Sequence, residues 1–163
     1  MKEDQLRELW NKGVVMMMQG YTWAEATLQV LRDVEGWGFS PYQWAAAGYS
    51  GAIDSGKTIC GMLFGATVFL GFMFGEKAPN APGIKDEKRI LAIASVNGLF
   101  NGFISKFGET ECRALTGCDF SNKEEVNRYI REEVYKNTCF RQFEYVLSYC
   151  TDQRSADLKT QSF

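Results

Sequence analysis

The sequence predicts an all-α protein, a single-domain helical bundle of about six to seven helices around a buried, glycine-rich central helix. Apolar residues recur at helical spacing in several segments, and capping sequences open some of them. No stretch shows the apolar–polar alternation that is typical of a strand. A chain of 163 residues buries a core without disulfides or metals. We therefore expect one bundle domain over residues 1–150 and a polar C-terminal tail over 151–163.

Composition and charge exclude several classes of function. The chain has no histidine, which excludes Ser-His-Asp and Cys-His catalysis, HExxH zinc sites and CxxCH haem attachment. The net charge of −2 favours neither nucleic acid nor acidic lipid as a partner. The N-terminus is charged and amphipathic and does not resemble a signal peptide. We expect a cytoplasmic protein with reduced thiols that binds no nucleic acid and no membrane.

The first fifty residues are predicted to form three helices. Residues 2–18 place leucines, Trp10 and methionines at helical spacing, which indicates an amphipathic helix. The segment Thr22–Glu25 matches a capping box, in which the threonine and glutamate side chains satisfy free amides at a helix start. A further helix is expected to begin at Ser40–Gln43, because proline is favoured at the first helical position.

The central stretch joins a glycine-rich loop to an apolar segment. Ile59–Phe74 carries no charge over its 16 residues, fewer than the roughly 20 needed to span a bilayer, so we expect a buried core helix. Gly51–Thr58 also matches the phosphate-loop pattern GxxxxGK[ST]. That loop needs a buried strand before it, whereas the alanine-rich segment here resembles a helix. A nucleotide binder therefore remains an alternative.

The second half of the chain is predicted to begin with a long helix over about 87–107, capped by Asp86. Gly98 and Gly102 are one turn apart on it, as Gly61 and Gly65 are on the central helix. Small residues at this spacing let two helices approach closely, so we infer that these two helices pack together.

Three shorter elements are expected to follow. Glu111–Thr116 is predicted to form a short helix, and Ser121–Glu124 matches a capping box that opens a helix to about Lys136. A last helix carries Cys139 and Cys150. The polar tail beyond it has the composition of a disordered segment.

The five cysteines are the candidate functional residues, and their odd number argues against a simple disulfide framework. Cys60 and Cys112 are each near the predicted start of a helix, where the dipole and free amides favour a thiolate. Lys57 and Arg113 are expected to add to this effect. Both cysteines are therefore candidate reactive thiols.

The other cysteines invite a plainer interpretation. Cys118 is a secondary candidate for a reactive thiol, because the neighbouring Asp119 is expected to raise its pKa. Cys150 is expected in the core or in contact with the tail. Since free cysteine often serves as a small buried hydrophobe, inert thiols remain the alternative throughout.

Four segments carry a further pattern. SGKTICGMLFGATVFLG places Cys60 at a glycine-rich helix start, FISKFGETECRALTGCDFS contains Cys112, and NTCFRQFEYVLSYC contains Cys139. In GYTWAEATLQVL, Trp23 precedes Ala-Glu-Ala. Together, over about residues 20–150, these segments resemble the proposed redox-active proteins named for the cysteine pattern C-GCAxxG-C-C. Trp23 stands where the first cysteine of that pattern is expected.

The resemblance implies a helical fold and a role in thiol redox chemistry or cofactor-linked electron transfer. Cys60 is then the nucleophilic or ligating thiol, with Cys112 and Cys139 as resolving or co-ligating partners. The resemblance is compatible with a metal or an iron–sulfur cluster but identifies no cofactor. Trp23 leaves a four-thiolate site one ligand short unless another cysteine substitutes.

Two classes of function follow from these observations, besides the nucleotide binder. In the first, the chain transfers electrons to an unidentified redox partner, and whether it is a thiol oxidoreductase enzyme stays open. In the second, the cysteines are inert and the chain is a non-catalytic helical module. Its methionine-rich first helix and its tail then mediate self-association, which makes a homo-oligomer the expected partner state.

Overall fold

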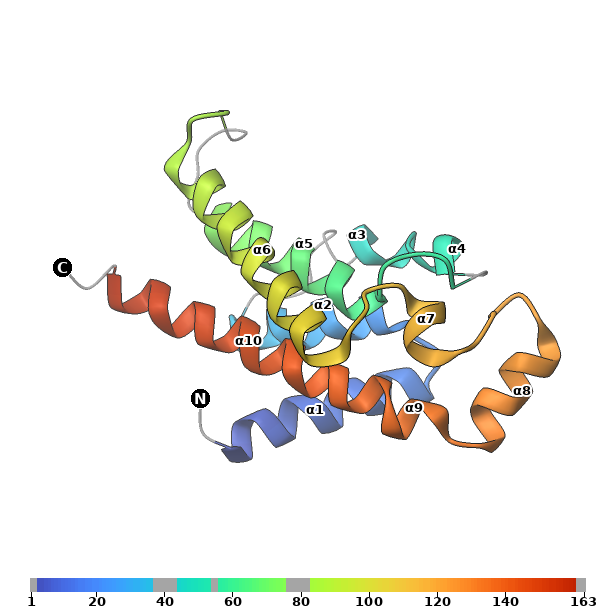
Figure 1. Ribbon diagram of the computed structural model, residues 1–163. Coiled ribbons are helices and arrows are strands. Elements are labelled where there is room, and N and C mark those ends of the chain that lie inside the picture. The colour runs from blue at the N-terminus through green and yellow to red at the C-terminus, as the bar shows by residue number, and fades with distance from the viewer. Residues whose placement is uncertain (1–2, 37–43, 54–55, 76–82, 161–163) are drawn as a thin grey trace.

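The computed structural model describes residues 3–36, 44–53, 56–75 and 83–160, without the side chains of 154–160. These residues form ten helical segments, six of them with nine residues or more, and the extended structure among them is one isolated bridge. The all-α prediction is therefore confirmed (Figure 1). The helices are α1 (Glu3–Met18), α2 (Trp23–Val34), α3 (Trp44–Ala47), α4 (Ser50–Ile53), α5 (Gly61–Gly75), α6 (Glu87–Phe107), α7 (Cys112–Thr116), α8 (Lys123–Arg131), α9 (Val134–Asn137) and α10 (Cys139–Thr160).

The core forms around α5, as the uncharged central stretch predicts. This helix packs against α2, α6 and α10, and α10 in turn contacts α1 (Figure 1). Leu63, Phe69 and Leu70 of α5 are at most 1% exposed. Burying such side chains removes apolar area from water at roughly 25 cal/mol per Å2, and this is the main force that joins the helices.

The glycines of α5 face α2. A Cβ added to Gly65 would lie 2.4 Å from the carbonyl oxygen of Ala24, and one added to Gly61 would lie 3.2 Å from the amide nitrogen of the same residue. The two helices therefore approach more closely than any side chain at these positions allows. The expectation that these glycines serve the contact with α6 is wrong, because helical spacing reveals a notch but not which helix enters it.

The glycines of α6 face α10 instead. A Cβ at Gly98 would lie 2.5 Å from the hydroxyl of Tyr149, and one at Gly102 would lie 2.2 Å from the hydroxyl of Tyr145. Each tyrosine crosses the α6 backbone at a glycine, and Tyr149 donates a hydrogen bond of 2.8 Å to the carbonyl oxygen of Ser95. Helices α5 and α6 do pack together, as inferred, but without using these notches.

The predicted capping sequences mostly form. Thr22 and Glu25 make the reciprocal capping box at the start of α2, and the Asp86 side chain caps α6. At α8 the cap is Asn122, whose side chain accepts from the amides of Glu124 and Glu125, so the prediction of Ser121 as the cap is wrong. The helix start predicted at Ser40–Gln43 lies outside the described residues.

Two predicted helix ends differ from the structure. The helix expected to reach Lys136 stops at Arg131, and Glu133 adopts φ 51° before α9 begins. The last helix continues to Thr160, although a disordered tail was expected after Cys150. Thr151 is only 4% exposed, which explains why the helix continues beyond the last cysteine.

The phosphate-loop alternative does not have its architecture here. The described residues before Gly56 form the short helices α3 and α4, not a strand. The carbonyl oxygen of Gly56 accepts a hydrogen bond of 2.8 Å from the amide of Arg113, so backbone of this loop is engaged with α7. The parallel sheet that a phosphate loop requires is absent from the described part of the chain.

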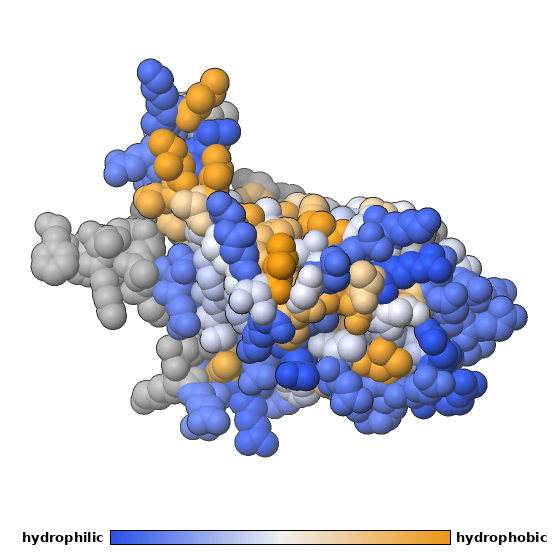
Figure 2. Space-filling model, viewed as in Figure 1, coloured by the Kyte–Doolittle hydropathy of each residue, from blue (hydrophilic) through white to orange (hydrophobic). Residues whose placement is uncertain are grey.

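One face of α6 is exposed and apolar. Ile90, Leu91 and Ile93, in the first half of α6, are each about half exposed. The start of this helix projects from the molecule (Figure 1), and Figure 2 shows orange apolar atoms on that projection. Within the described residues, α6 is the one helix long and apolar enough to cross a membrane, judged by length and composition, and 17% of its apolar window is buried. That no membrane is bound stays a prediction.

Candidate functional site

Three cysteines from distant parts of the chain each stand at the start of a helix. Cys60 directly precedes α5, Cys112 is the first residue of α7, and Cys139 is the first residue of α10. Cys60 and Cys139 are each 4% exposed, whereas Cys112 is partly exposed. All five thiols are free. Backbone hydrogen bonds join the segments of Cys60 and Cys112, and Cys139 is close enough to affect the pKa of both, so the structure brings the three predicted site residues to one region. Their chemical roles stay predictions.

A short backbone pairing aligns the first two of these cysteines. Ile59 and Glu111 form an isolated antiparallel bridge. On either side of it, the amide of Cys60 donates to the carbonyl of Thr110 at 2.7 Å, and the amide of Cys112 donates to the carbonyl of Thr58 at 2.9 Å. Each cysteine follows a member of the bridged pair by one residue. Because successive side chains along a strand alternate between faces, Cys60 and Cys112 share the face opposite to that of Ile59 and Glu111.

An aromatic residue supports this pairing from behind. The Tyr49 hydroxyl donates a hydrogen bond of 2.5 Å to the carbonyl oxygen of Ile59, and its ring stacks on Phe64 at a centroid distance of 4.2 Å. Burial raises the pKa of the Tyr49 hydroxyl, which even without this shift is a protonated donor at neutral pH. The loop before α5 is thus fixed on one side by Tyr49 and on the other by the segment before α7.

Cys139 contacts a residue that sequence reasoning missed. A hydrogen bond of 3.1 Å joins the hydroxyl of Tyr129, on α8, to the Cys139 thiol. The Thr138 hydroxyl lies 3.6 Å from the same sulfur. Burial raises the pKa of the Tyr129 hydroxyl, and the nearby thiols Cys139 and Cys112 raise it further. Nothing in the sequence around Tyr129 distinguishes it from other residues on a charged helix.

The three thiols lie within electrostatic reach of one another. Burial is the largest cause of the raised pKa of Cys60, and the charges of Cys139 and Cys112 raise it further. Burial likewise raises the pKa of Cys112 to about 12, with Cys139 as the next cause. A negative charge on one sulfur therefore disfavours a second, so the reduced site favours neutral thiols.

The surroundings of Cys60 and Cys112 oppose the thiolates expected at these helix starts. The amides of Met62 and Leu63 do hydrogen-bond Cys60 and lower its pKa, as a helix start should. Burial outweighs that effect, because a charged sulfur loses its hydration. Arg113, expected to favour a thiolate at Cys112, instead forms an ion pair of 2.8 Å with Asp119. Exposure is set by the tertiary fold, which local sequence does not reveal.

Trp23, at the position of the family pattern's first cysteine, also lies near this site. Trp23 is the first residue of α2, and its ring packs on Phe143 at 5.0 Å and on Phe140 at 6.0 Å, both in the first turns of α10. The next residue, Ala24, contacts Gly61 beside Cys60. An indole ring thus occupies the position where the pattern has a cysteine, against the helix that begins with Cys139.

A metal or iron–sulfur cluster does not fit the residues present. Across the described residues, no three Cys, Asp or Glu side chains have the arrangement that holds a metal ion. A four-thiolate cluster also lacks one ligand, because Trp23 has no donor atom suited to iron. We therefore derive no chemistry through such a group.

The remaining two cysteines have different surroundings. Cys118 is fully buried just after α7, and burial and then Glu125 raise its pKa, with Asp119 contributing as expected. Cys150 is fully buried in the core on α10, and burial is the single cause of its raised pKa. The prediction of Cys150 as a core residue is confirmed.

Comparison with known proteins agrees with this geometry. A family model described as "Putative redox-active protein (C_GCAxxG_C_C)" matches residues 21–152. No curated protein and no solved structure matches the chain. The match covers most of the chain and includes α2, the three helix starts with their cysteines and Trp23. The chain therefore belongs to the C_GCAxxG_C_C family of putative redox-active proteins.

Proposed function

We propose that the chain is a thiol redox protein in which two of Cys60, Cys112 and Cys139 form a reversible disulfide. In the oxidising direction, two thiols lose two protons and two electrons, and one sulfur–sulfur bond forms. The electron acceptor is a disulfide of a partner molecule, whose own sulfur–sulfur bond breaks to give two thiols. The protein then returns to the dithiol form by the reverse exchange.

The observation that supports this proposal is the mutual influence of the three thiols. Each of Cys60 and Cys112 has Cys139 as its strongest charged neighbour after burial. These mutual effects indicate that the three thiols lie in one neighbourhood, and a disulfide between two of them requires their Cα atoms to come within about 7 Å. Cys112, the partly exposed member, is the entry point for a partner disulfide.

The raised pKa values limit how fast such a site reacts. A thiolate is the nucleophile in disulfide exchange, and burial keeps these thiols protonated. The same observation supports the alternative of a non-catalytic helical module with inert cysteines, since a buried neutral thiol also serves as an ordinary core residue. The two functions differ in whether the thiols change oxidation state together and reversibly.

The test is an equilibrium titration of the native protein. Reduced protein is equilibrated anaerobically with mixtures of reduced and oxidised dithiothreitol, quenched in acid and alkylated, and its free thiols are counted by intact mass. We expect two thiols to disappear together in one reversible transition. Cys150→Ala should keep this transition, and Cys139→Ala should remove it or shift its midpoint. Five free thiols at every ratio would establish the inert module instead.

A further inference from the structure

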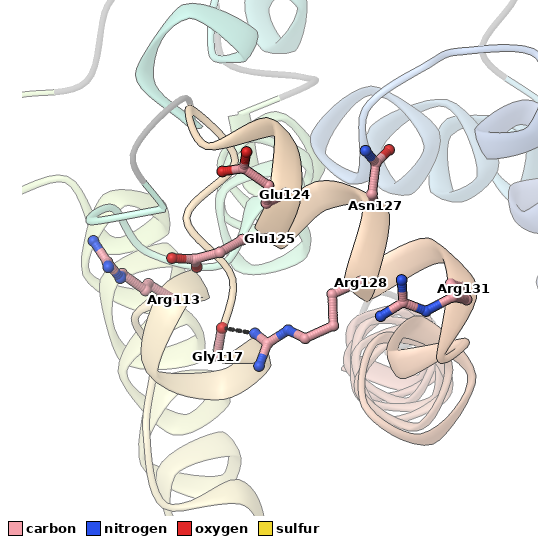
Figure 3. A pocket seen from close by; sticks show the side chains of 7 residues that line it. All are labelled: Arg113, Gly117, Glu124, Glu125, Asn127, Arg128 and Arg131. Atoms are coloured by element: carbon pink, nitrogen blue, oxygen red, sulfur yellow. Dashed lines mark hydrogen bonds between the residues drawn. The ribbon is translucent and has the colours of Figure 1, made fainter.

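A charged pocket of about 740 Å3 lies beside the thiol site, between α7, the turn that follows it and α8 (Figure 3). We refer to it as the α7–α8 pocket. Its charged lining residues carry both signs, with three guanidinium groups and two carboxylates: Arg113, Arg128, Arg131, Glu124 and Glu125. The volume falls within the range of about 300–1,000 Å3 that is usual for small-molecule sites.

The backbone that lines this pocket also carries the cysteine site. Arg113 directly follows Cys112, and Arg128 directly precedes Tyr129, whose hydroxyl bonds the Cys139 thiol. Charges of the pocket reach a buried sulfur as well, because Glu125 raises the pKa of Cys118 and Arg128 lowers it. A ligand in the pocket is thus next to the segment that ends in the partly exposed thiol.

Both the cationic and the anionic side chains of this pocket have hydrogen-bonding groups left for a ligand. Arg128 donates one hydrogen bond of 2.5 Å to the carbonyl of Gly117, which leaves its other donors for a ligand. Arg131 has a side chain that is 72% exposed, and its ion pair among the described residues is with its neighbour Glu132, at 3.3 Å. Glu124 forms no ion pair within the described residues. In Figure 3, Arg128 and Arg131 lie to the right of Glu125, and Arg113 lies at the left end of the view.

We propose that the α7–α8 pocket binds the peptide part of a low-molecular-weight disulfide that carries both carboxylate and ammonium groups. The guanidinium groups of Arg128 and Arg131 bind its carboxylates through paired N–H donors, a geometry that lysine cannot provide. Glu124 accepts from its ammonium group. The proposal rests on the proposed function, and it adds the substrate class and the residues that select it.

The chemistry of this step balances without another reactant. The Cys112 thiolate attacks one sulfur of the bound disulfide, whose sulfur–sulfur bond breaks and releases one half as a thiol. Cys139 then attacks the Cys112 sulfur and releases the second half, so a protein disulfide forms. The two protein thiol protons pass to the two released thiols. Since few thiolates exist at neutral pH, holding the disulfide in place offsets the low reactivity.

The experiment compares three disulfides with the reduced full-length chain at pH 8. Glutathione disulfide carries both charges, cystamine carries only ammonium groups, and bis(2-hydroxyethyl) disulfide is neutral. The rate at which the free Cys112 thiol disappears is followed by acid quenching, alkylation and peptide mass spectrometry. We expect glutathione disulfide to react about tenfold faster than the neutral disulfide and to saturate, since charge-assisted hydrogen bonds discriminate by this order.

Variants assign the effect to the pocket. Arg128→Gln with Arg131→Gln should remove the advantage of glutathione disulfide, so that it reacts with this variant no faster than the neutral disulfide does. Because Arg128 also holds the turn through Gly117, Arg131→Gln alone is the second variant and should lose part of the advantage. Arg7→Gln with Arg141→Gln, which removes the same charge from a different pocket, is the matched control and should change nothing.

The outcomes separate this inference from the proposed function. Equal rates for glutathione disulfide and the neutral disulfide would overturn the pocket assignment, and so would an advantage that survives loss of both arginines. If cystamine reacts fastest, the carboxylates of the pocket, and not its guanidinium groups, dominate ligand binding. That result would also overturn the pocket assignment. If the dithiothreitol titration finds no disulfide at all, the proposed function fails and this inference fails with it.

Discussion

Helix α10 carries two buried cysteines whose surroundings differ in kind. Cys139, at its first position, is 4% exposed and touches the Tyr129 hydroxyl. Cys150, three turns further along, is fully buried, and burial is the single cause of its raised pKa. The charge of Cys139 acts on both Cys60 and Cys112, whereas neither of these thiols responds to Cys150.

The difference teaches that burial alone does not separate a structural cysteine from a candidate redox cysteine. Both residues satisfy the usual description of a small buried hydrophobe. What distinguishes Cys139 is its place at a helix start, where α10 meets the segments before α5 and α7. Helix ends bring polar groups and backbone turns together, and these are the neighbours that thiol chemistry needs.

The largest expected effect is the pH dependence of Cys112 alkylation. Burial raises its pKa to about 12, so the thiolate fraction still grows tenfold with each pH unit across the measured range. Between pH 8 and pH 10 the iodoacetamide rate should rise about 100-fold, whereas an ordinary thiol of pKa about 8.5 would rise about fourfold and level off. Mass spectrometry of the native protein provides the rate.

Cys150 is the reference in the same experiment. Because it is fully buried, it should stay unmodified over this range for as long as the protein stays folded. A rate at Cys112 that levels off by pH 9 would mean that its thiol is not held in the neutral form by burial. If Cys112 and Cys150 were modified at equal rates, the difference in accessibility between the site cysteine and the core cysteine would be contradicted.

The second effect concerns the α2–α5 contact that holds Cys60 in place. In Gly65→Ala the new methyl group meets the Ala24 carbonyl oxygen at 2.4 Å, so the helices must separate. We expect a loss of about 1–3 kcal/mol in the free energy of unfolding and faster alkylation of Cys60.

Gly71→Ala is the matched control on the same helix. Gly71 is exposed and nothing lies within 4 Å of its Cβ position, so the change should stabilise the helix by roughly 0.5–1 kcal/mol. Urea unfolding of both variants measures the two effects. Equal changes in the two variants would show that the close approach of α2 and α5 is not needed to position Cys60.

The smallest effect comes from the Tyr129 hydroxyl. Tyr129→Phe removes its hydrogen bond to Cys139 and should cost about 0.5–1.5 kcal/mol. The hydroxyl lowers the pKa of Cys139, so its loss should raise that pKa and slow exchange at this thiol. Urea unfolding and the rate of thiol oxidation are the two measurements.

Tyr149→Phe provides the comparison on the Cys150 side of α10. It removes a bond of 2.8 Å to the Ser95 carbonyl, so the cost in stability should be similar. Oxidation of Cys139 should not change. If both variants alter that oxidation equally, the effect belongs to general loosening of α10 and not to the hydroxyl–thiol bond.

Much of the fold could be predicted because its signals are local. The caps at Thr22 and Asp86 and the uncharged run of α5 each depend on residues within one or two turns. The break at Glu133 could not be predicted, since a glutamate with φ 51° has no sequence signature of its own. The partners of the glycines in α5 and α6 depend on how helices are arranged in space.

The residues of the candidate site could be predicted, but their burial, pKa shifts and neighbours could not. The family pattern singled out Cys60, Cys112 and Cys139, and the fold brings these thiols within reach of one another. The pKa shifts run opposite to the direction expected from the helix starts, because a helix start favours a thiolate only where water or charge supports it. Tyr129 was missed because its contact with Cys139 joins two helices across a turn.

The most direct test is a map of the disulfide that forms in the native, oxidised chain. Peptide mass spectrometry identifies which two sulfurs are linked, and the account predicts a bond within one chain between members of Cys60, Cys112 and Cys139. Cys150 should remain a free thiol in the same sample. A bond that includes Cys150, or bonds that form only between separate chains, would contradict the claim that three helix starts make one redox site.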